Sequence, residues 1–145
     1  MPERETVERA REDAREGKSP STQAGEFVRE EMHHIGEGKH GAASTKQAIA
    51  IGLSKARRAG VKLPAKGSAS TQKKAEQDTR ASQSRRKPSR TRSRASSNAL
   101  KREPRSAASR SSLSRQAKSS AVSRGKRARS VAAKKAAQTR TRRAA

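Results

Sequence analysis

Residues 39–55 read KHGAASTKQAIAIGLSK, and the eight residues from Gln47 to Ser54 are the longest run in the chain without a charged side chain. Ser44 stands three positions before Gln47, which is the spacing of a capping box, where the two side chains bond each other's backbone amides at a helix start. The stretch therefore predicts a helix over about 44–59 with an apolar side that a core can form against.

Two more helices are predicted before this one. Charged pairs at helical spacing favour a helix over about 6–16, which Gly17 ends. Ser19 followed by Pro20 is typical of a helix start, and the second helix runs from there to Gly36. The predicted core joins one stripe of the second helix, Phe27, Val28, Met32 and Ile35, to one side of the third, Ile49, Leu53 and Ala56.

The balance of charge changes near Pro64. Residues 1–65 contain 12 Lys and Arg against 10 Asp and Glu, whereas residues 66–145 contain 25 Lys and Arg against 3 acidic residues. Large apolar side chains are concentrated in the first part and scarce in the second. These shifts predict a helical head over residues 1–64 and a basic tail over residues 65–145.

The composition is typical of a largely disordered protein. Hydrophobic residues make up 28% of the chain and the formal net charge is +24, so little apolar surface is present to offset the conformational entropy of folding. We therefore expect a small all-α head of about three short helices, followed by a long intrinsically disordered basic tail. The head has few large apolar residues, so its self-association is an alternative that stays open.

Catalytic and metal-binding patterns are weak in this sequence. Cysteine is absent, which excludes disulfides and thiolate chemistry. One cluster of potential ligands stands out, comprising His33, His34 and His40 with Glu30 and Glu37 nearby. Because adjacent histidines on a helix point about 100° apart, we interpret them as polar residues at a helix end. We expect a protein that is not an enzyme, with no cofactor, no metal and no small-molecule substrate.

Residues 28–61, VREEMHHIGEGKHGAASTKQAIAIGLSKARRAGV, resemble an uncharacterised family of short basic bacterial proteins that share a KQAIAI-type helix. The motif lies at Lys46 to Ser54, with Gly52 where the family usually has Ala. The resemblance implies a bacterial origin and a helical head, but no activity. The Gly costs the helix up to about 1 kcal/mol.

The tail resembles a second group of proteins in composition. SVAAKKAAQ at 130–138 is similar to the Lys/Ala repeats of bacterial histone H1-like nucleoid proteins, and SRTRSRASS at 89–97 is similar to Ser/Arg-rich or protamine-like segments. That resemblance implies a nucleoid-associated protein that neutralises DNA. A strongly basic chain attracts polyanions in any case, since each contacted phosphate releases a counterion.

The predicted function is therefore non-sequence-specific binding of nucleic acid, DNA above all, in the cytoplasm at the nucleoid. The predicted phosphate contacts are Arg85, Arg86, Lys87, Arg90, Arg92, Arg94, Lys101, Arg102, Arg124, Lys126, Arg127, Arg129, Lys134, Lys135, Arg140, Arg142 and Arg143. A secondary basic face is predicted at Lys55, Arg57, Arg58 and Lys62.

The sequence leaves one alternative to this function open and disfavours several others. An RNA- or ribosome-associated cationic chaperone or assembly factor remains the main one, because A-form helices present the same phosphates. Stacking on single strands is disfavoured because no aromatic residue follows Phe27. A helix-turn-helix is disfavoured by the long link between the second and third helices. The charged N-terminus lacks the apolar segment of a secretory signal, and the uncharged run is too short for a transmembrane segment.

Overall fold

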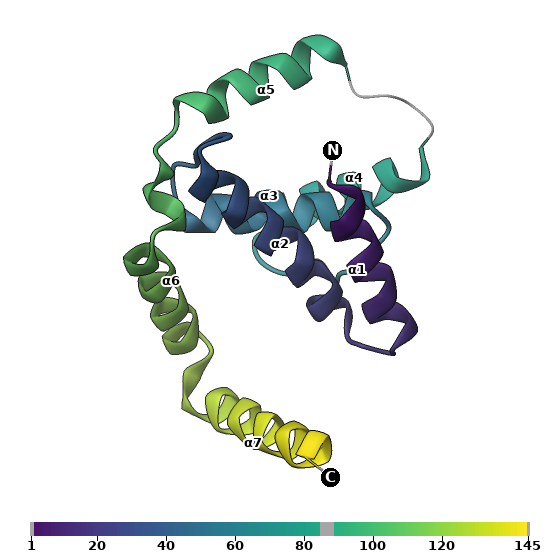
Figure 1. The fold of residues 1–145 in the computed structure, drawn as a ribbon, viewed down its shortest axis with the longest axis vertical. Helices are drawn as coiled ribbons and strands as arrows, with labels where there is room; N and C mark the ends of the chain where they lie inside the picture. Colours follow the sequence, from purple (N-terminus) through teal and green to yellow (C-terminus); the bar gives the residue numbers. More distant parts are fainter. Residues whose placement is uncertain (1, 85–88, 145) are drawn as a thin grey trace. The chain divides into compact units, whose positions relative to one another are not determined.

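The computed structural model describes residues 2–84 and 89–144, and the regular structure in these two ranges is helical. Figure 1 follows the helices along the chain. They are α1 (Arg4–Arg15), α2 (Pro20–Glu37), α3 (Thr45–Arg58), α4 (Ala69–Gln83), α5 (Arg90–Arg102), the 3-10 helix η1 (Arg105–Ala108), α6 (Arg110–Ser123) and α7 (Gly125–Ala144). The chain divides into two units, Met1–Ser109 and Arg110–Ala145.

The expectation of a long disordered tail is wrong. Helices α4, α5, α6 and α7 all lie beyond Pro64, and α4 and η1 belong to the first unit together with the predicted head. The expectation failed because low apolar content limits the formation of a core but does not prevent a helix from forming. Ala, Arg, Lys and Gln are among the residues with the highest helix propensity, and they are abundant in the tail.

The capping residues start the helices as predicted. The Ser19 side chain accepts a hydrogen bond from the Thr22 backbone amide at 3.3 Å, and Ser44 accepts one from Gln47 at 3.1 Å. The Gln47 side chain accepts from the backbone amide of Ala43 at 2.6 Å, one residue before the position expected for a capping box. Both signals are local, which is why the sequence alone locates these two helix starts.

Glycines end the helices, with one correction to the prediction. Gly17 and Gly60 adopt positive φ angles of 71° and 96° just after α1 and α3. Helix α2 continues past Gly36 to Glu37, and Gly38, at φ 79°, takes the left-handed position. The Gly38 and Lys39 amides then bond the carbonyls of the last turn, so the glycine that ends the helix is Gly38, two residues after the predicted Gly36.

Helix α3 buries only small residues, among them the predicted Ala56, while the predicted Leu53 packs half-buried against the same core. Its buried residues are Thr45, Ala48, Gly52 and Ala56. A Cβ atom on Gly52 would lie 2.8 Å from the Val28 Cα, so glycine permits α2 and α3 to approach backbone to backbone. Ile49 is only half-buried, which corrects its predicted place in the core.

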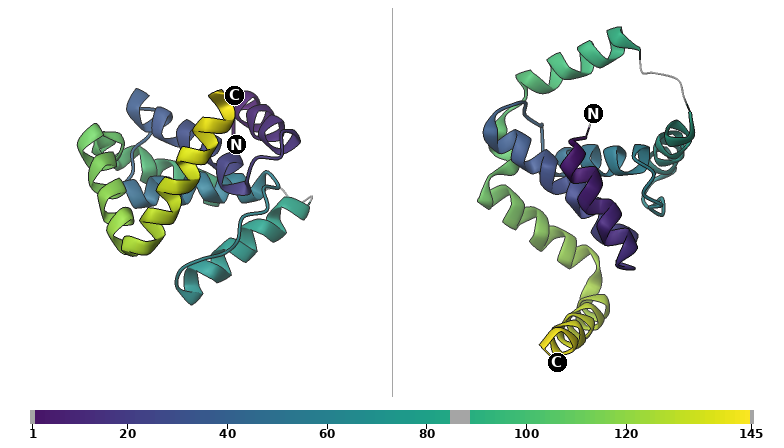
Figure 2. Two further views of the ribbon diagram at one scale, coloured as in Figure 1. Left: turned by 90° about the horizontal axis from the view of Figure 1, so that it is seen from below. Right: turned by 45° about the vertical axis from the view of Figure 1, so that its right-hand side comes forward.

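Two apolar clusters hold the first unit together. Helices α1 and α3 pack on α2, and α4 packs on α3 (Figure 2). The first cluster contains the fully buried Phe27 with Ala10, Ala24 and Ala56. The second contains the fully buried Ile35 with Ala42, Ala48 and Ala107. Because Ala107 comes from η1, the core extends more than forty residues beyond the predicted head.

The loop between α2 and α3 is the place where the later chain joins the core. The Gly41 amide donates to the Leu100 carbonyl at 2.8 Å, and the Thr45 hydroxyl donates to the Ala107 carbonyl at 2.6 Å. A side chain at Gly41 would collide with the carbonyl of Glu103. The Gly-rich link that separates the two helices therefore receives the end of α5 and η1.

Candidate nucleic-acid interface

Helix α5 presents basic residues without any acidic residue among them. It has no buried residue, and its five Lys and Arg side chains are exposed. Arg90, Arg94 and Lys101 fall on one face at helical spacing, so the charge is concentrated on that side of the helix. These five are all predicted phosphate contacts, namely Arg90, Arg92, Arg94, Lys101 and Arg102.

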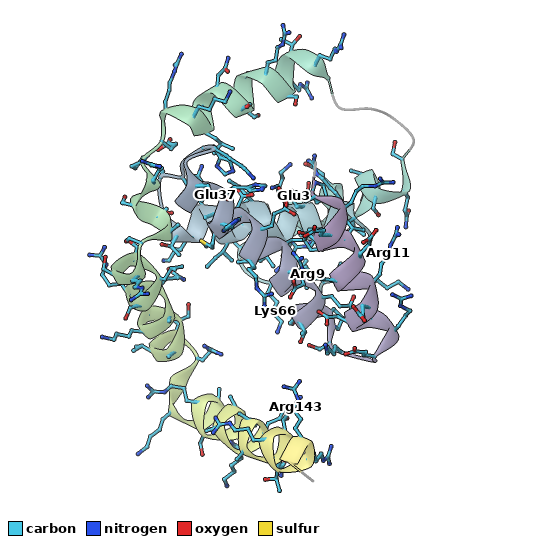
Figure 3. The ribbon with its side chains drawn as sticks, in the orientation of Figure 1. Glu3, Arg9, Arg11, Glu37, Lys66 and Arg143 are labelled. Atoms are coloured by element: carbon cyan, nitrogen blue, oxygen red, sulfur yellow. The ribbon has the colours of Figure 1, made fainter. Side chains whose placement is uncertain are left out.

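Helix α7 carries the largest group of predicted contacts. Its eight Lys and Arg residues are exposed and are distributed around the whole helix, and Figure 3 shows side chains of α7, with Arg143 labelled, projecting on several sides. They are Lys126, Arg127, Arg129, Lys134, Lys135, Arg140, Arg142 and Arg143. Arg124 lies in the turn between α6 and α7, and its Nε donates to the Ser120 carbonyl at 3.3 Å.

The remaining members of the predicted set are placed differently. Arg85, Arg86 and Lys87 lie outside the described residues. The prediction omitted Arg110, Arg115 and Lys118, which are exposed on α6 and add to the charge of the second unit. The rule that identified the others, a basic residue in a stretch without acids, would have found these three as well.

The secondary basic face predicted on α3 is partly engaged by acidic residues. Lys55 Nζ lies 3.1 Å from Glu30 Oε1 and 2.7 Å from Glu31 Oε2. Arg58 Nε donates to Asp78 Oδ1 at 2.9 Å. Lys62 is exposed after the helix end. Two of the four cations therefore hold the fold together and are less available for phosphate than their charge suggests.

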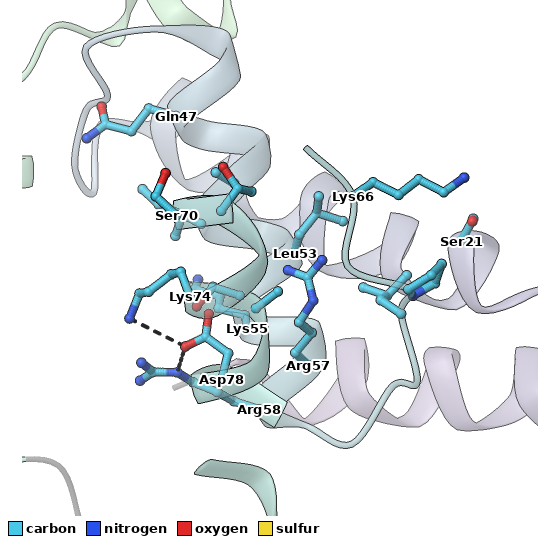
Figure 4. Close-up of a pocket in the computed structure, with 17 residues that line it drawn as sticks. Ser21, Gln47, Leu53, Lys55, Arg57, Arg58, Lys66, Ser70, Lys74 and Asp78 are labelled. Atoms are coloured by element: carbon cyan, nitrogen blue, oxygen red, sulfur yellow. Dashed lines mark hydrogen bonds and ion pairs between the residues drawn. The ribbon is translucent and has the colours of Figure 1, made fainter. Parts of the chain in front are cut away.

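A groove of about 890 Å³ runs between α3 and α4 in the first unit (Figure 4). Lys55, Arg57, Arg58, Lys66 and Lys74 line it together with apolar residues of α3. Asp78 is 2% exposed and is paired with Arg58 and Lys74, as the dashed lines of Figure 4 mark. One of the few acidic residues of the predicted tail thus anchors α4 to α3.

The charge of Lys55 is preserved inside the fold. Burial alone would lower the pKa of Lys55, but the contacts with Glu31 and Glu30 outweigh it and raise the pKa above its ordinary value. Burial would likewise raise the pKa of Glu30, yet hydrogen bonds from the Glu3 amide and the Thr6 hydroxyl, together with Lys55, hold it below the ordinary range. Lys55 and Glu30 are therefore held in their charged forms between α2 and α3.

The histidines do not lie as the sequence analysis grouped them. His33 is exposed and pairs with Glu37, with Nε2 2.9 Å from Oε1. His34 and His40 instead converge on Glu31, a residue that the sequence analysis left out of the cluster. The signal that was missed is helical spacing, because Glu31 and His34 are three residues apart and share a face of α2.

Comparison with known proteins identifies one similarity. A family model described as a family of unknown function (DUF6496) matches residues 15–67. The match includes the 28–61 stretch and therefore supports the predicted resemblance to an uncharacterised family. It spans α2, α3 and the segment that follows, and it stops before α4 and the basic helices.

No curated protein and no solved structure matches the chain. Within residues 2–84 and 89–144, no helix combines the length and the apolar character that a membrane span requires.

Proposed function

We propose that this protein binds nucleic acid duplexes, DNA above all, without reading their sequence, and that helices α5, α6 and α7 supply the contacts. One observation carries the proposal: these three helices present exposed Lys and Arg residues and contain no Asp or Glu. Within the described residues none of these cations forms an ion pair with an acid, so they are available to phosphates. A duplex offers one negative charge per about 1.7 Å of its axis.

The dimensions of α7 suit a duplex. Its 20 residues, at about 1.5 Å per residue, make a rod of about 30 Å, close to the ~34 Å helical turn of DNA. Cations on all sides of the rod can contact phosphates of the two strands across a groove. Because α7 buries no apolar face that would fix its rotation, no set of side chains is held to read base edges.

The composition of the tail also supports a nucleoid role. The stretch 130–138 lies within α7 and resembles the Lys/Ala repeats of bacterial histone H1-like proteins. Arg, which outnumbers Lys in the tail, grips a phosphate with two donors at once. Both features support the proposal that the protein neutralises DNA at the nucleoid.

The proposal is tested by the salt dependence of binding. The full-length chain is titrated onto two unrelated DNA duplexes, and onto an RNA duplex of the same length, over a series of salt concentrations. If about ten phosphates are contacted, log K falls against log salt with a slope near −9. The two DNA duplexes are expected to bind equally.

Two results would oppose the proposal. Strong preference for one DNA sequence with a shallow slope would mean that the protein reads bases. Much tighter binding to the RNA duplex would favour the RNA-associated alternative over a nucleoid role.

A further inference from the structure

Glu31, His34 and His40 bring three potential metal ligands together in the first unit. One ligand atom from each residue lies within 4.8 Å of the other two. Glu31 and His34 belong to one face of α2, and His40 reaches them from the loop before α3. Glu31 is fully buried, and the side chains of His34 and His40 are only 12% and 17% exposed.

In the neutral form of the two histidines, their hydrogen bonds leave one ring nitrogen on each with a lone pair. His40 Nδ1 lies 3.1 Å from the Gly41 carbonyl, which can only accept, so Nδ1 carries the proton. His34 Nε2 lies 2.8 Å from the Glu3 carboxylate and donates in the same way. A carbonyl or carboxylate behind each imidazole is the arrangement that orients metal-binding histidines in proteins.

The two oxygens of the Glu31 carboxylate have different partners, Lys55 for one and His40 for the other. Its Oε2 lies 2.7 Å from Lys55 Nζ, and its Oε1 lies 3.4 Å from His40 Nε2. Within the described residues neither oxygen accepts a hydrogen bond of good geometry, although both are buried. When His40 is neutral, Glu31 Oε1 and His40 Nε2 are therefore two acceptors that face each other. A cation between these two atoms would stabilise the arrangement.

The charges around the cluster also favour a cation. One lysine, Lys55, contacts the buried carboxylates of both Glu30 and Glu31, at 3.1 Å and 2.7 Å, so two acidic side chains face a single lysine. On the outer side, Glu3 contacts His34 and Lys39, and Lys39 is shared with Glu37. In a chain of net charge +24 this is a local site of negative charge.

We propose that Glu31, His34 and His40 form a binding site for a divalent transition-metal ion, of which Zn²⁺ fits the donor set best. Two imidazole nitrogens and one carboxylate oxygen are ligands that Zn²⁺ takes at about 2.0–2.2 Å, with a fourth position left to another donor. The inference is independent of nucleic-acid binding.

The position of His40 gives such an ion a structural effect. His40 precedes Gly41 and Ala42, whose amides bond to the Leu100 and Pro104 carbonyls. An ion bound to His40 and to α2 would fix the loop that receives the end of α5 and η1. Metal binding is thus expected to stabilise the first unit as a whole, because a ligand that binds only the folded state shifts the unfolding equilibrium.

The experiment uses full-length protein without an affinity tag, stripped of metal with a chelator. Zn²⁺ binding is followed by calorimetry, and Co²⁺ is added as a spectroscopic probe because its absorption reports the number and type of ligands. We expect one Zn²⁺ ion per chain and a higher melting temperature with Zn²⁺ than with chelator. His40→Gln and His34→Gln should each weaken Zn²⁺ binding by more than about 10-fold. Changing a residue that only supports a metal ligand already costs about 10-fold or more, and loss of the ligand itself should cost more.

His33→Gln is the matched control, since His33 neighbours His34 on α2 but is 70% exposed and pairs with Glu37. It should bind Zn²⁺ as the unaltered chain does. The helix content of each variant is measured by circular dichroism, and if His40→Gln fails to fold, the Co²⁺ spectrum of the unaltered chain decides the matter. The proposal is overturned if that spectrum shows no nitrogen ligation or if Zn²⁺ does not bind. It is also overturned if His33→Gln weakens binding as much as His40→Gln.

Discussion

Helices α3 and α7 are both rich in Ala, Lys and Arg, yet they have opposite roles. Helix α3 buries Thr45, Ala48, Gly52 and Ala56 on one face, so its small residues hold it against α2. The alanines of α7 are not gathered into a buried face, and Val131 is 60% exposed. The spacing of small residues, and not their number, decides whether such a helix builds a core or displays charge.

The largest effect is expected from Phe27→Ala, which would test whether stability resides in the first unit. Phe27 of α2 is fully buried in a cluster with residues of α1 and α3. Truncation of a buried Phe typically costs about 3–5 kcal/mol of stability. Urea denaturation followed by circular dichroism measures the loss. Unchanged stability would mean that α3 and α2 do not form a packed core around Phe27.

Lys55→Met should cost about 3 kcal/mol, because it leaves the buried Glu30 and Glu31 without their shared cation. We take the low end of the usual range because the Lys55 side chain is 21% exposed. Lys46→Met is the control on the same helix, since Lys46 is exposed, and its effect should stay within about 0.5 kcal/mol. Equal effects of the two variants would show that Lys55 acts only as surface charge.

The shifted pKa values of Glu30 and Lys55 predict how the stability of the protein depends on pH. The pKa of Glu30 lies below its ordinary 4.5, so its contribution is complete above pH 4.5 and is lost as the pH falls through the lowered value. The pKa of Lys55 lies above its ordinary 10.5, so its contribution is complete below pH 10.5 and is lost as the pH rises through the raised value. Denaturation midpoints measured at acid and at alkaline pH should show the two losses, and Lys55→Met should remove the part of the alkaline loss that Lys55 causes.

A smaller effect is expected from two glycines that differ in their surroundings. Gly52→Ala gains helix propensity, but its new Cβ would lie 2.8 Å from the Val28 backbone, so we expect a loss of about 1–3 kcal/mol. Gly25 lies within α2 with no atom near the position of a Cβ, so Gly25→Ala should stabilise the protein by up to about 1 kcal/mol. Thermal melts of the two variants should show a lower melting temperature for Gly52→Ala and a higher one for Gly25→Ala. Stabilisation by both would refute the close contact of α2 and α3.

Local signals explain why part of the fold could be predicted from the sequence. Ser19 and Ser44 bond to amides three residues away, and Gly17 and Gly60 end helices through their own backbone conformation. Neither kind of signal requires knowledge of the tertiary fold, so the starts of α2 and α3 and the ends of α1 and α3 were identified.

Long-range contacts explain what could not be predicted. Gly52 appeared to weaken α3, and only its proximity to Val28 gives the glycine a role. Ala107 enters the core from a segment that composition assigned to a disordered tail. In the candidate interface, charge counting identified the cations of α5 and α7 but could not show that Lys55 and Arg58 are paired with acids.

The most direct test of the account removes the same amount of positive charge from α7 and from the N-terminal region. One full-length variant replaces five exposed cations of α7 with Gln, namely Lys134, Lys135, Arg140, Arg142 and Arg143. The other replaces five exposed cations of the N-terminal region with Gln, namely Arg4, Arg11, Arg15, Lys46 and Lys62. Both variants lose the same net charge. DNA affinity is then measured for both variants and for the unaltered chain over one salt series.

If α7 contacts the phosphates, its variant should show a salt slope shallower by up to about 4.5 units, at roughly 0.9 for each lost contact. The N-terminal variant should change the slope by less than about one unit, because its missing cations do not belong to the helices of the proposed interface. A larger loss of slope in the N-terminal variant than in the α7 variant would contradict the account and would move the nucleic-acid interface to the region that contains α3.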